Sequence, residues 1–288
     1  MNLCMSTLPN FDLQSGLALT RDAGFTGIEL RVHDQYHISL NELYHKAREV
    51  RALVDSHQLD LSVFNTYYGI NDECAVDTLI RACRRSGVRF FRVVLPVAGC
   101  AQVAEQAIEG AVIPSYVDKT PIEKLLPKVR MALQKLEAKA KAAKVTAMVE
   151  IHWGTIMSSF AAAHLLMEGI DPTAVALTFD PANMVIEGKE DWEFGIALLH
   201  RQFANLHIKN ASWFQKPSGW QWGWSALDDG LVDWPSLYEL LKRCNYQGLE
   251  SMEDFRVPHD YDNARQHLRH LIYQVNQFRA APTVARVA

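Results

Sequence analysis

The sequence lacks the features that mark several common classes of protein. Its 288 residues carry 29 basic and 33 acidic side chains, so the basic surplus of a nucleic-acid-binding protein is missing. No apolar run approaches the roughly 18 residues of a membrane span. The N-terminal stretch, which includes Asp12, has no apolar segment after a basic start. We therefore expect a cytoplasmic protein with neither a nucleic-acid nor a membrane partner.

Two further absences concern cysteine and glycine patterns. The five cysteines form no CxxC pair and their spacing is irregular, which favours reduced, buried thiols over a disulfide framework. No GxGxxG motif follows the first apolar run, and glycine-rich phosphate loops are absent. A doubly wound, nucleotide-binding sheet is therefore the less favoured α/β architecture.

Short apolar runs alternate with longer amphipathic stretches from one end of the chain to the other. Eight of these runs have the character of buried strands, and helical patterns lie between them. The expected strands are Asn2–Met5, Gly27–Arg31, Asp60–Asn65, Phe90–Pro96, Val145–His152, Val175–Asp180, Ala204–Lys209 and Gly248–Glu253. Examples of the expected helices are Leu40–His57, Val76–Ser86, Trp192–Gln202 and Trp234–Cys244. This count predicts an α/β fold, a (β/α)₈ TIM barrel that forms a single domain over residues 1–288.

A helix is also expected after Thr120, because Thr120 can act as its N-cap, with Pro121 in the first turn and Glu123 completing a capping box. Pro127 leaves two alternatives, since it either kinks this helix or marks its true start.

Two segments, Val97–Lys119 and Asn210–Val232, are too long for simple connections. Both follow strands, on the side where barrel active sites are built. The second segment is rich in aromatic residues, among them Trp213, and it is either a core cluster or a lid or subunit contact.

The last four expected strands each end in a side chain that can bind a metal ion: Glu150, Asp180, His207 and Glu253. Successive side chains of a strand point to opposite faces. In the first three of these strands the neighbours are apolar, so the polar side chains face the barrel axis. The last strand is mixed, because Glu250 lies on the face opposite Glu253. We take Glu253 as the residue at the mouth and keep Glu250 as the alternative.

Three carboxylates and one imidazole suit one divalent metal ion, either Mn²⁺, Mg²⁺ or Co²⁺, with Zn²⁺ as a further option. A buried glutamate such as Glu150 is costly unless it is paired, protonated or bound to a metal. Without a cation, clustered acids would repel and raise one another's pKa. The pattern of strand ends therefore predicts a metal centre.

At these residues the sequence resembles the xylose isomerase-like TIM barrels, a superfamily that includes sugar isomerases, ketose 3-epimerases, inosose dehydratases and endonuclease IV. The resemblance spans nearly the whole chain, through "GFTGIEL", "MVEIHWG", "FDPANM", "NLHIKN", "DDGLVDWPSLYELLKRCNYQG" and "ESMEDF". It implies that Glu150, Asp180, His207 and Glu253 bind one metal ion. The family phrase "GYxGxxxxE" ends here at Glu253, which favours this residue over Glu250.

Two positions depart from the ketose 3-epimerase pattern. Asn183 stands where those enzymes have a histidine three residues after the metal-binding aspartate, and Trp213 stands where they have an arginine. We expect both residues to contact substrate, but the departures argue against a standard keto-hexose 3-epimerase. Endonuclease IV needs several more ligands for its three zinc ions, so it fits less well.

The site chemistry predicts a metal-dependent isomerase or epimerase that acts on a small ketose or aldose, with Glu150 and Glu253 as the acid–base pair. His152 and Lys209 either bind substrate hydroxyls or support the ligands. An inosose dehydratase-type lyase and a non-catalytic sugar-binding relative are the alternatives. The expected partners are a small sugar or polyol and further copies of the chain, in a dimer or tetramer.

Overall fold

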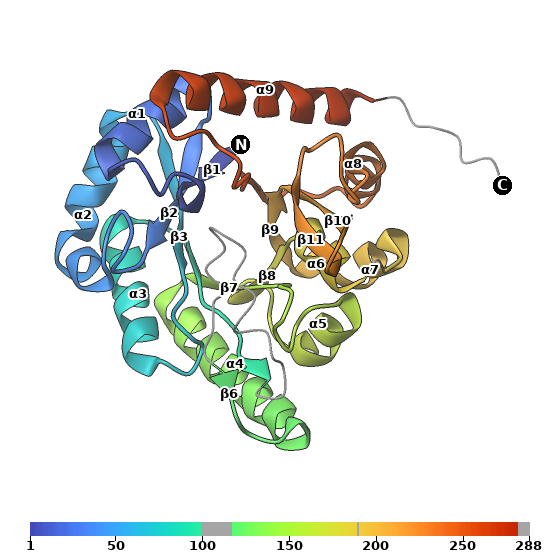
Figure 1. The fold of residues 1–288 in the computed structure, drawn as a ribbon. Coiled ribbons are helices and arrows are strands. Elements are labelled where there is room, and N and C mark those ends of the chain that lie inside the picture. The colour runs from blue at the N-terminus through green and yellow to red at the C-terminus, as the bar shows by residue number, and fades with distance from the viewer. Residues whose placement is uncertain (99–116, 189, 282–288) are drawn as a thin grey trace.

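Parallel strands close into a barrel at the centre of the computed structural model, which describes residues 1–98, 117–188 and 190–281 (Figure 1). Around the barrel the strands follow the order β1-β12-β9-β8-β7-β4-β3-β2. Their bounds are β1 Asn2–Cys4, β2 Gly27–Val32, β3 Asp60–Thr66, β4 Phe90–Arg92, β7 Thr146–Glu150, β8 Val175–Phe179, β9 Phe203–Ile208 and β12 Leu249–Met252. The predicted fold class is confirmed, and each predicted strand overlaps one of these eight.

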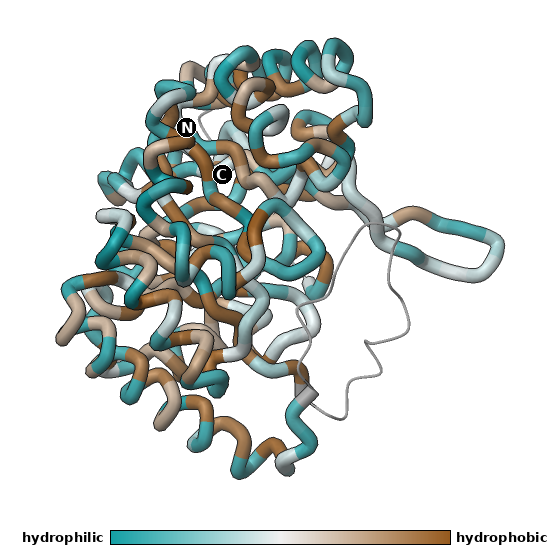
Figure 2. The backbone as a smooth tube through the Cα atoms, turned by 90° about the vertical axis from the view of Figure 1, so that its left-hand side faces the viewer, coloured by the Kyte–Doolittle hydropathy of each residue, from teal (hydrophilic) through white to brown (hydrophobic). Residues whose placement is uncertain are grey.

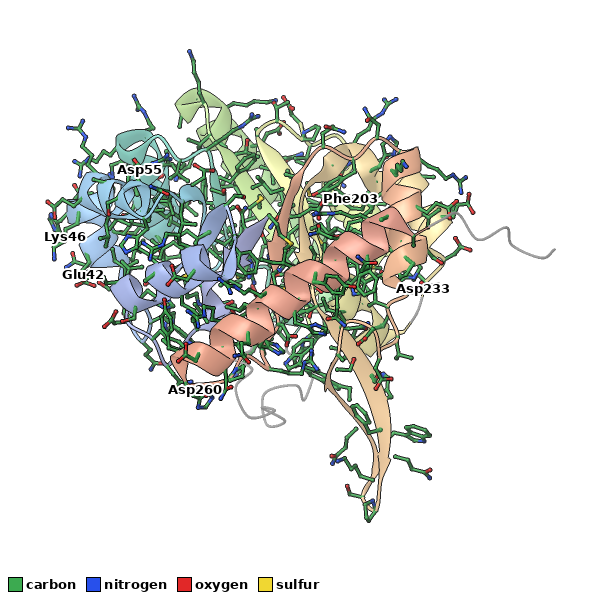
Figure 3. The ribbon with its side chains drawn as sticks, turned by 90° about the horizontal axis from the view of Figure 1, so that it is seen from above. Glu42, Lys46, Asp55, Phe203, Asp233 and Asp260 are labelled. Carbon is green, nitrogen blue, oxygen red and sulfur yellow. The ribbon has the colours of Figure 1, made fainter. Side chains whose placement is uncertain are left out.

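Helices surround the barrel, and nearly all of them begin at a side chain that accepts a hydrogen bond from the first turn. The helices are α1 Leu13–Ala23, α2 Leu40–Ser56, α3 Glu73–Ser86, α4 Ile122–Ala143, α5 Phe160–Met167, α6 Pro181–Glu187, α7 Trp192–Leu199, α8 Trp234–Arg243 and α9 Tyr261–Ala280. The capping residues include Asp233 of α8 and Asp260 of α9 (Figure 3). In the part of the chain that is described, no helix is long and apolar enough to cross a lipid bilayer.

Helix α4 starts one residue later than the sequence indicates. Pro121 is its N-cap and no side chain caps it, so the prediction of Thr120 as N-cap is wrong. Asp118 accepts the backbone N–H of Thr120 at 2.9 Å, and Lys128 donates to its hydroxyl at 3.3 Å, so both groups are engaged before the helix begins. Pro127 lies inside the helix and does not mark its start.

The aromatic-rich segment after β9 is a hairpin rather than a loop. Strands β10 (Asn210–Lys216) and β11 (Gly219–Ser225) pair antiparallel, and Figures 2 and 3 show this hairpin projecting away from the barrel. Trp213 is 40% exposed on it. Of the other long segment, β5 (Val97–Ala98) and β6 (Val117–Asp118) are paired, while residues 99–116 lie outside the described residues.

The hairpin is joined to the barrel mouth by a row of aromatic rings. Trp222 packs edge-on against Trp153 with ring centroids 5.0 Å apart, and against Trp224 at the same separation. Trp224 in turn lies 5.3 Å from Phe255, which follows β12. Part of the aromatic segment is therefore packed, as expected for a core cluster, while Trp213 is exposed. The predicted homo-oligomer stays a prediction.

Gly195 marks a close contact between α7 and α5. A Cβ atom at this position would lie 1.9 Å from the ring of Phe160, which is itself packed against Phe179 and Trp192. We expect Gly195→Ala to lower the free energy of unfolding by about 1–3 kcal/mol through overpacking, even though alanine favours helix more than glycine does. Urea denaturation followed by circular dichroism measures this, and equal or higher stability would contradict the packing described.

Candidate metal centre

Four side chains from neighbouring strands converge at the carboxyl ends of the barrel strands. Glu150 ends β7, Asp180 follows β8, His207 lies in β9 and Glu253 follows β12, and each offers a ligand atom within 4.8 Å of the others. All four are at most 5% exposed. Glu250 lies elsewhere: it accepts a hydrogen bond from Tyr238 at 2.8 Å and pairs with Arg279. The structure therefore places Glu253, and not Glu250, in the cluster.

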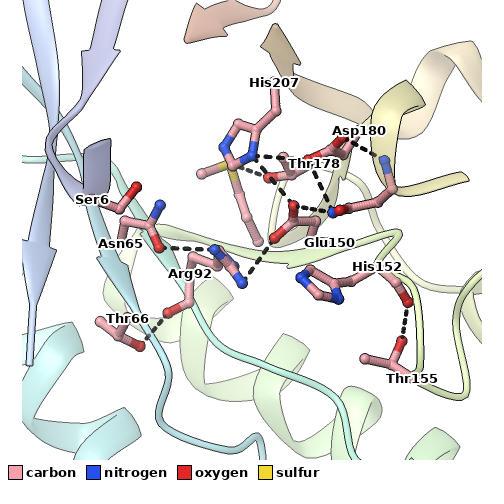
Figure 4. Close-up of polar contacts among 12 residues, drawn as sticks. Ser6, Asn65, Thr66, Arg92, Glu150, His152, Thr155, Thr178, Asp180 and His207 are labelled. Carbon is pink, nitrogen blue, oxygen red and sulfur yellow. Dashed lines mark hydrogen bonds and ion pairs between the residues drawn. The ribbon is translucent and has the colours of Figure 1, made fainter. Parts of the chain in front are cut away.

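His207 is oriented by carboxylates on both edges of its ring, of which Figure 4 shows Glu150 and Asp180. Its Nδ1 lies 3.3 Å from Glu150, 3.5 Å from Asp180 and 3.1 Å from Glu253. Its Nε2 lies 3.3 Å from Oε2 of Glu29. Burial lowers the pKa of His207, but the carboxylates of Glu253, Glu29 and Glu150 outweigh this and raise that pKa well above its usual value. In the neutral imidazole that a metal would bind, Nε2–H donating to Glu29 leaves Nδ1 as the nitrogen that can bind a metal.

Asn183 links two of the acidic residues. The Asp180 carboxylate caps α6 by accepting the backbone N–H of Asn183 at 3.0 Å. The Asn183 side-chain amide then donates to Asp180 at 2.9 Å and to Glu150 at 3.0 Å. The carboxylate of Asp180 thus both caps α6 and belongs to the cluster, so the start of α6 fixes the position of this carboxylate.

Each glutamate is held by its own cation. Arg92 lies 2.8 Å from Glu150, and Lys209 lies 2.5 Å from Glu253. Burial raises the pKa of Glu150, but Arg92 and His207 together outweigh burial and lower that pKa far below its usual range. Burial likewise raises the pKa of Glu253, and Lys209 and His207 lower it well below its usual range. Both glutamates are therefore ionised.

Lys209 is almost fully buried and lies between two of the carboxylates. Its ammonium group is 2.7 Å from Asp180 as well as 2.5 Å from Glu253. Burial lowers the pKa of Lys209, and these two carboxylates outweigh that effect and raise the pKa above its usual value. The side chain also lies over the ring of Trp224 at 4.9 Å. Lys209 thus remains a cation and partly neutralises the acidic cluster.

The donor set fits a divalent metal ion. Three carboxylates and one imidazole are ligands that Mg²⁺, Mn²⁺, Co²⁺ and Zn²⁺ accept. Nδ1 of His207 is buried and has no hydrogen-bond partner among the described residues, although buried polar atoms are nearly always satisfied. This nitrogen faces three carboxylates, which is the arrangement that a bound cation would complete.

A narrow cavity opens beside the cluster. Its lining is mainly polar and aromatic: Ser6, Arg31, Tyr36, Tyr67, Arg92, Glu150, His152, Trp153, Asn183, Lys209, Trp224, Glu253 and Phe255. Of the residues predicted to contact substrate, His152, Lys209 and Asn183 line the cavity and Trp213 does not.

Several residues of the site come from the first half of the barrel, which sequence reasoning did not consider. Glu29 and Arg31 alternate with apolar residues in β2, Asn65 is the last residue but one of β3, and Arg92 ends β4. All four are buried. The same test of alternating faces that identified Glu150 and Asp180 would have found them.

Cys4 lies at the edge of the cluster. Its Sγ is 3.4 Å from Glu253 and 3.0 Å from the hydroxyl of Ser6. Burial, together with Glu253 and Glu29, raises the pKa of Cys4, so the group is a neutral thiol. The prediction of reduced thiols agrees with the described cysteines, which form no disulfide, although Cys74 is exposed.

Glu29 controls which nitrogen of His207 can reach a metal, because it accepts from Nε2. We expect Glu29→Gln to weaken metal binding about 10- to 100-fold, the usual effect of changing a group that orients a ligand. Titration with Mn²⁺ followed by electron paramagnetic resonance measures this. Glu49→Gln, an exposed residue of α2, is the matched control. Equal affinity in the wild type and Glu29→Gln would argue against this role.

The chain was compared with known proteins. The profile of the xylose isomerase-like TIM barrel family matches residues 17–274. No curated protein matches. Several solved structures are similar, each with low sequence identity, so they establish the fold alone.

Three of these structures illustrate the similarity. A xylose isomerase-like TIM barrel protein from Mycobacterium smegmatis, in complex with magnesium, is 18% identical with a TM-score of 0.68, covering 93% of this chain and 88% of its own. The IOLI protein with a bound zinc atom is 16% identical with a TM-score of 0.69, covering 97% of both chains. Escherichia coli 3-keto-D-glucoside 4-epimerase is 17% identical with a TM-score of 0.66, covering 92% of this chain and 94% of its own. Because the profile spans most of the sequence, the chain belongs to the xylose isomerase-like TIM barrel family.

Proposed function

We propose that the protein is a divalent-metal-dependent isomerase or epimerase of a small ketose or aldose. The observation that carries this proposal is the convergence of Glu150, Asp180, His207 and Glu253 at the mouth of the barrel, where His207 Nδ1 faces the other three side chains. The similar structures with magnesium or zinc, and the epimerase among them, support it. We also propose that the protein acts in the cytoplasm.

The four residues would hold the metal ion, either Mn²⁺, Mg²⁺ or Co²⁺, with Zn²⁺ as a further option. When bound, such a cation polarises a sugar carbonyl and acidifies the neighbouring C–H group. Glu29 keeps His207 in the tautomer that offers Nδ1, and Asn183 holds Glu150 and Asp180 at a fixed separation.

Glu150 and Glu253 would transfer the proton. Both are ionised, which is the state in which a carboxylate can accept a proton from carbon. They come from strands on different sides of the cluster, so one can remove the proton and the other can return it. Return to the adjacent carbon gives isomerisation, and return to the opposite face of the same carbon gives epimerisation.

His152 and Lys209 would bind the substrate. Nδ1 of His152 lies 2.7 Å from the carbonyl oxygen of Trp153, which leaves Nε2 as an acceptor for a sugar hydroxyl. Burial lowers the pKa of His152, so the imidazole is neutral. The ammonium group of Lys209 would stabilise the negative oxygen that develops when the proton leaves carbon. Trp224, which lines the cavity, replaces Trp213 as the aromatic residue best placed to pack against the sugar.

The test is incubation of the metal-loaded protein with a panel of ketoses and inososes in D₂O. We expect incorporation of deuterium next to the carbonyl, observed by NMR, together with formation of an isomer or epimer. Loss of water with a new enone absorbance would instead indicate the dehydratase alternative. Binding without exchange would indicate the non-catalytic alternative. The Asp180→Ala variant, treated in the same way, controls for a contaminating enzyme.

A further inference from the structure

Arg31 is a buried cation for which the proposed reaction has no use. It lies in β2, is 1% exposed and lines the cavity. Its Nε and Nη1 atoms are buried and have no hydrogen-bond partner among the described residues. No carboxylate of the described chain pairs with it, in contrast to Arg92, which pairs with Glu150. A buried guanidinium normally has its donors satisfied, so Arg31 needs a partner from outside the described chain.

Two aromatic rings hold the guanidinium in place. Its carbon lies 3.3 Å from the ring centre of Tyr67 and 4.6 Å from that of Tyr36. These contacts engage the faces of the planar group and leave its N–H edges available. Nε and Nη1 lie on different edges, and each edge, together with Nη2, offers two parallel donors, the geometry that matches the two oxygens of a carboxylate.

Tyr67 also lies between Arg31 and Arg92, which contacts the cluster. Its ring centre lies 5.2 Å from the guanidinium carbon of Arg92, and Arg92 contacts Glu150. One cavity contains Arg31, Glu150 and Glu253. A small substrate can therefore meet the two glutamates with its carbonyl end and Arg31 with its other end.

The charges of the site agree with an anionic ligand. The four carboxylates of Glu29, Glu150, Asp180 and Glu253 exceed by one the three cations Arg31, Arg92 and Lys209. A divalent metal ion bound through neutral His207 would turn this excess into one positive charge. A single carboxylate balances that charge. A phosphate ester carries nearly two negative charges, which is more than this balance needs.

From these contacts we propose that the substrate is a sugar acid, whose carboxylate Arg31 binds through two parallel hydrogen bonds. This inference rests on the proposed function and names the class of substrate. Arg31 is thus the residue that distinguishes a sugar acid from the neutral sugar of the same size.

Calorimetric titration of the metal-loaded protein tests the proposal with two probes that differ only at C6: D-fructuronate, which has a carboxylate there, and D-fructose, which has a hydroxymethyl group. We expect D-fructuronate to bind about 10- to 100-fold more tightly, the contribution of a charge-assisted hydrogen-bonded pair. Arg31→Met should bring this ratio close to one, and Arg31→Lys should leave it at an intermediate value.

Arg89→Met is the matched control, because Arg89 precedes β4 and lines a different cavity. It should keep the wild-type ratio. Metal content and circular dichroism of each variant show that the fold and the metal centre persist. D-Fructose 6-phosphate forms a third arm, and stronger binding of this phosphate than of D-fructuronate would overturn the choice of a carboxylate.

Equal binding of the two probes by the wild type, or no measurable binding of D-fructuronate, would overturn the proposal. So would an unchanged ratio in a folded Arg31→Met variant. These outcomes are separate from those of the deuterium experiment. If neutral ketoses exchange deuterium and the acid does not bind more tightly, only the role of Arg31 is refuted. If binding depends on Arg31 but no substrate exchanges deuterium, only the proposed reaction is refuted.

Discussion

Glu253→Gln and Glu150→Gln are each expected to lower kcat by about 10²- to 10⁴-fold, the usual contribution of general acid–base catalysis. Glutamine keeps an oxygen that can bind a metal ion, but its amide cannot take up a proton at neutral pH. We therefore expect turnover to fall much more than metal occupancy. Kinetics on the substrate identified by the deuterium experiment, combined with elemental analysis of the same samples, measures both quantities.

Glu250→Gln is the matched control for this experiment. It makes the same substitution three positions earlier in the chain, on a residue that contacts Tyr238 and Arg279 outside the cluster. It should leave kcat near the wild-type value. A Glu253→Gln variant that binds metal normally and turns over at close to the wild-type rate would exclude the two-glutamate mechanism.

Asp180→Ala is expected to produce the largest loss of metal. The wild type should hold close to one divalent ion per chain after supplementation, while the variant should bind more than about 100-fold more weakly, because losing a ligand costs more than losing a group that orients one. His207→Ala should have a similar effect. Elemental analysis after dialysis against the metal measures occupancy, and thermal unfolding shows whether the variants are folded.

Asp180 also caps α6, so its removal costs stability for a second reason. Asp191→Ala separates the two effects, since Asp191 caps α7 by accepting the N–H of Phe194 at 2.8 Å and has no contact with the cluster. It should reduce stability to a similar extent and keep the metal. A folded Asp180→Ala variant with full metal occupancy would remove the basis of the proposed mechanism.

The four residues of the cluster could be predicted from the sequence because each stands where an apolar strand ends. In β8, for example, Leu177 and Phe179 pack outside the barrel, and this places Asp180 at its mouth. The residue contributed by the last strand was harder to predict, since Glu250 and Glu253 lie on opposite faces of a strand in which apolar and polar residues do not alternate cleanly. The family resemblance favoured Glu253, and the structure agrees.

The strand pattern places Arg31 and Arg92 inside the barrel, but their roles could not be predicted from it. A metal ligand can be recognised in a sequence by its own functional group, whereas the role of a buried arginine depends on the residues that it contacts. Arg92 has such a partner in Glu150, which comes from a different strand, and Arg31 has only the faces of Tyr36 and Tyr67. Contacts of this kind arise from the closure of the barrel, which no local pattern reports.

The sequence contains a strand pattern for the hairpin, but its many aromatic residues suggested a core cluster, a lid or a subunit contact instead. Trp220, Trp222 and Trp224 recur at every second position, which is the period of a strand. Pro217 and Ser218 form a two-residue connection between β10 and β11. Which of the rings are covered depends on Trp153 and Phe255, far away in sequence.

The pairing of β1 with β12 affects how the protein is made. Asn2 lies beside Ser251 in this pair, and Cys4 contacts Glu253, 249 positions further along the chain. During synthesis the barrel therefore stays open, with the edges of β1 and β9 unpaired, until β12 has emerged. Glu253, the fourth residue of the proposed metal site, is also the last of the four to be made. We therefore expect metal capture to follow closure of the barrel, as a late step in the maturation of the chain.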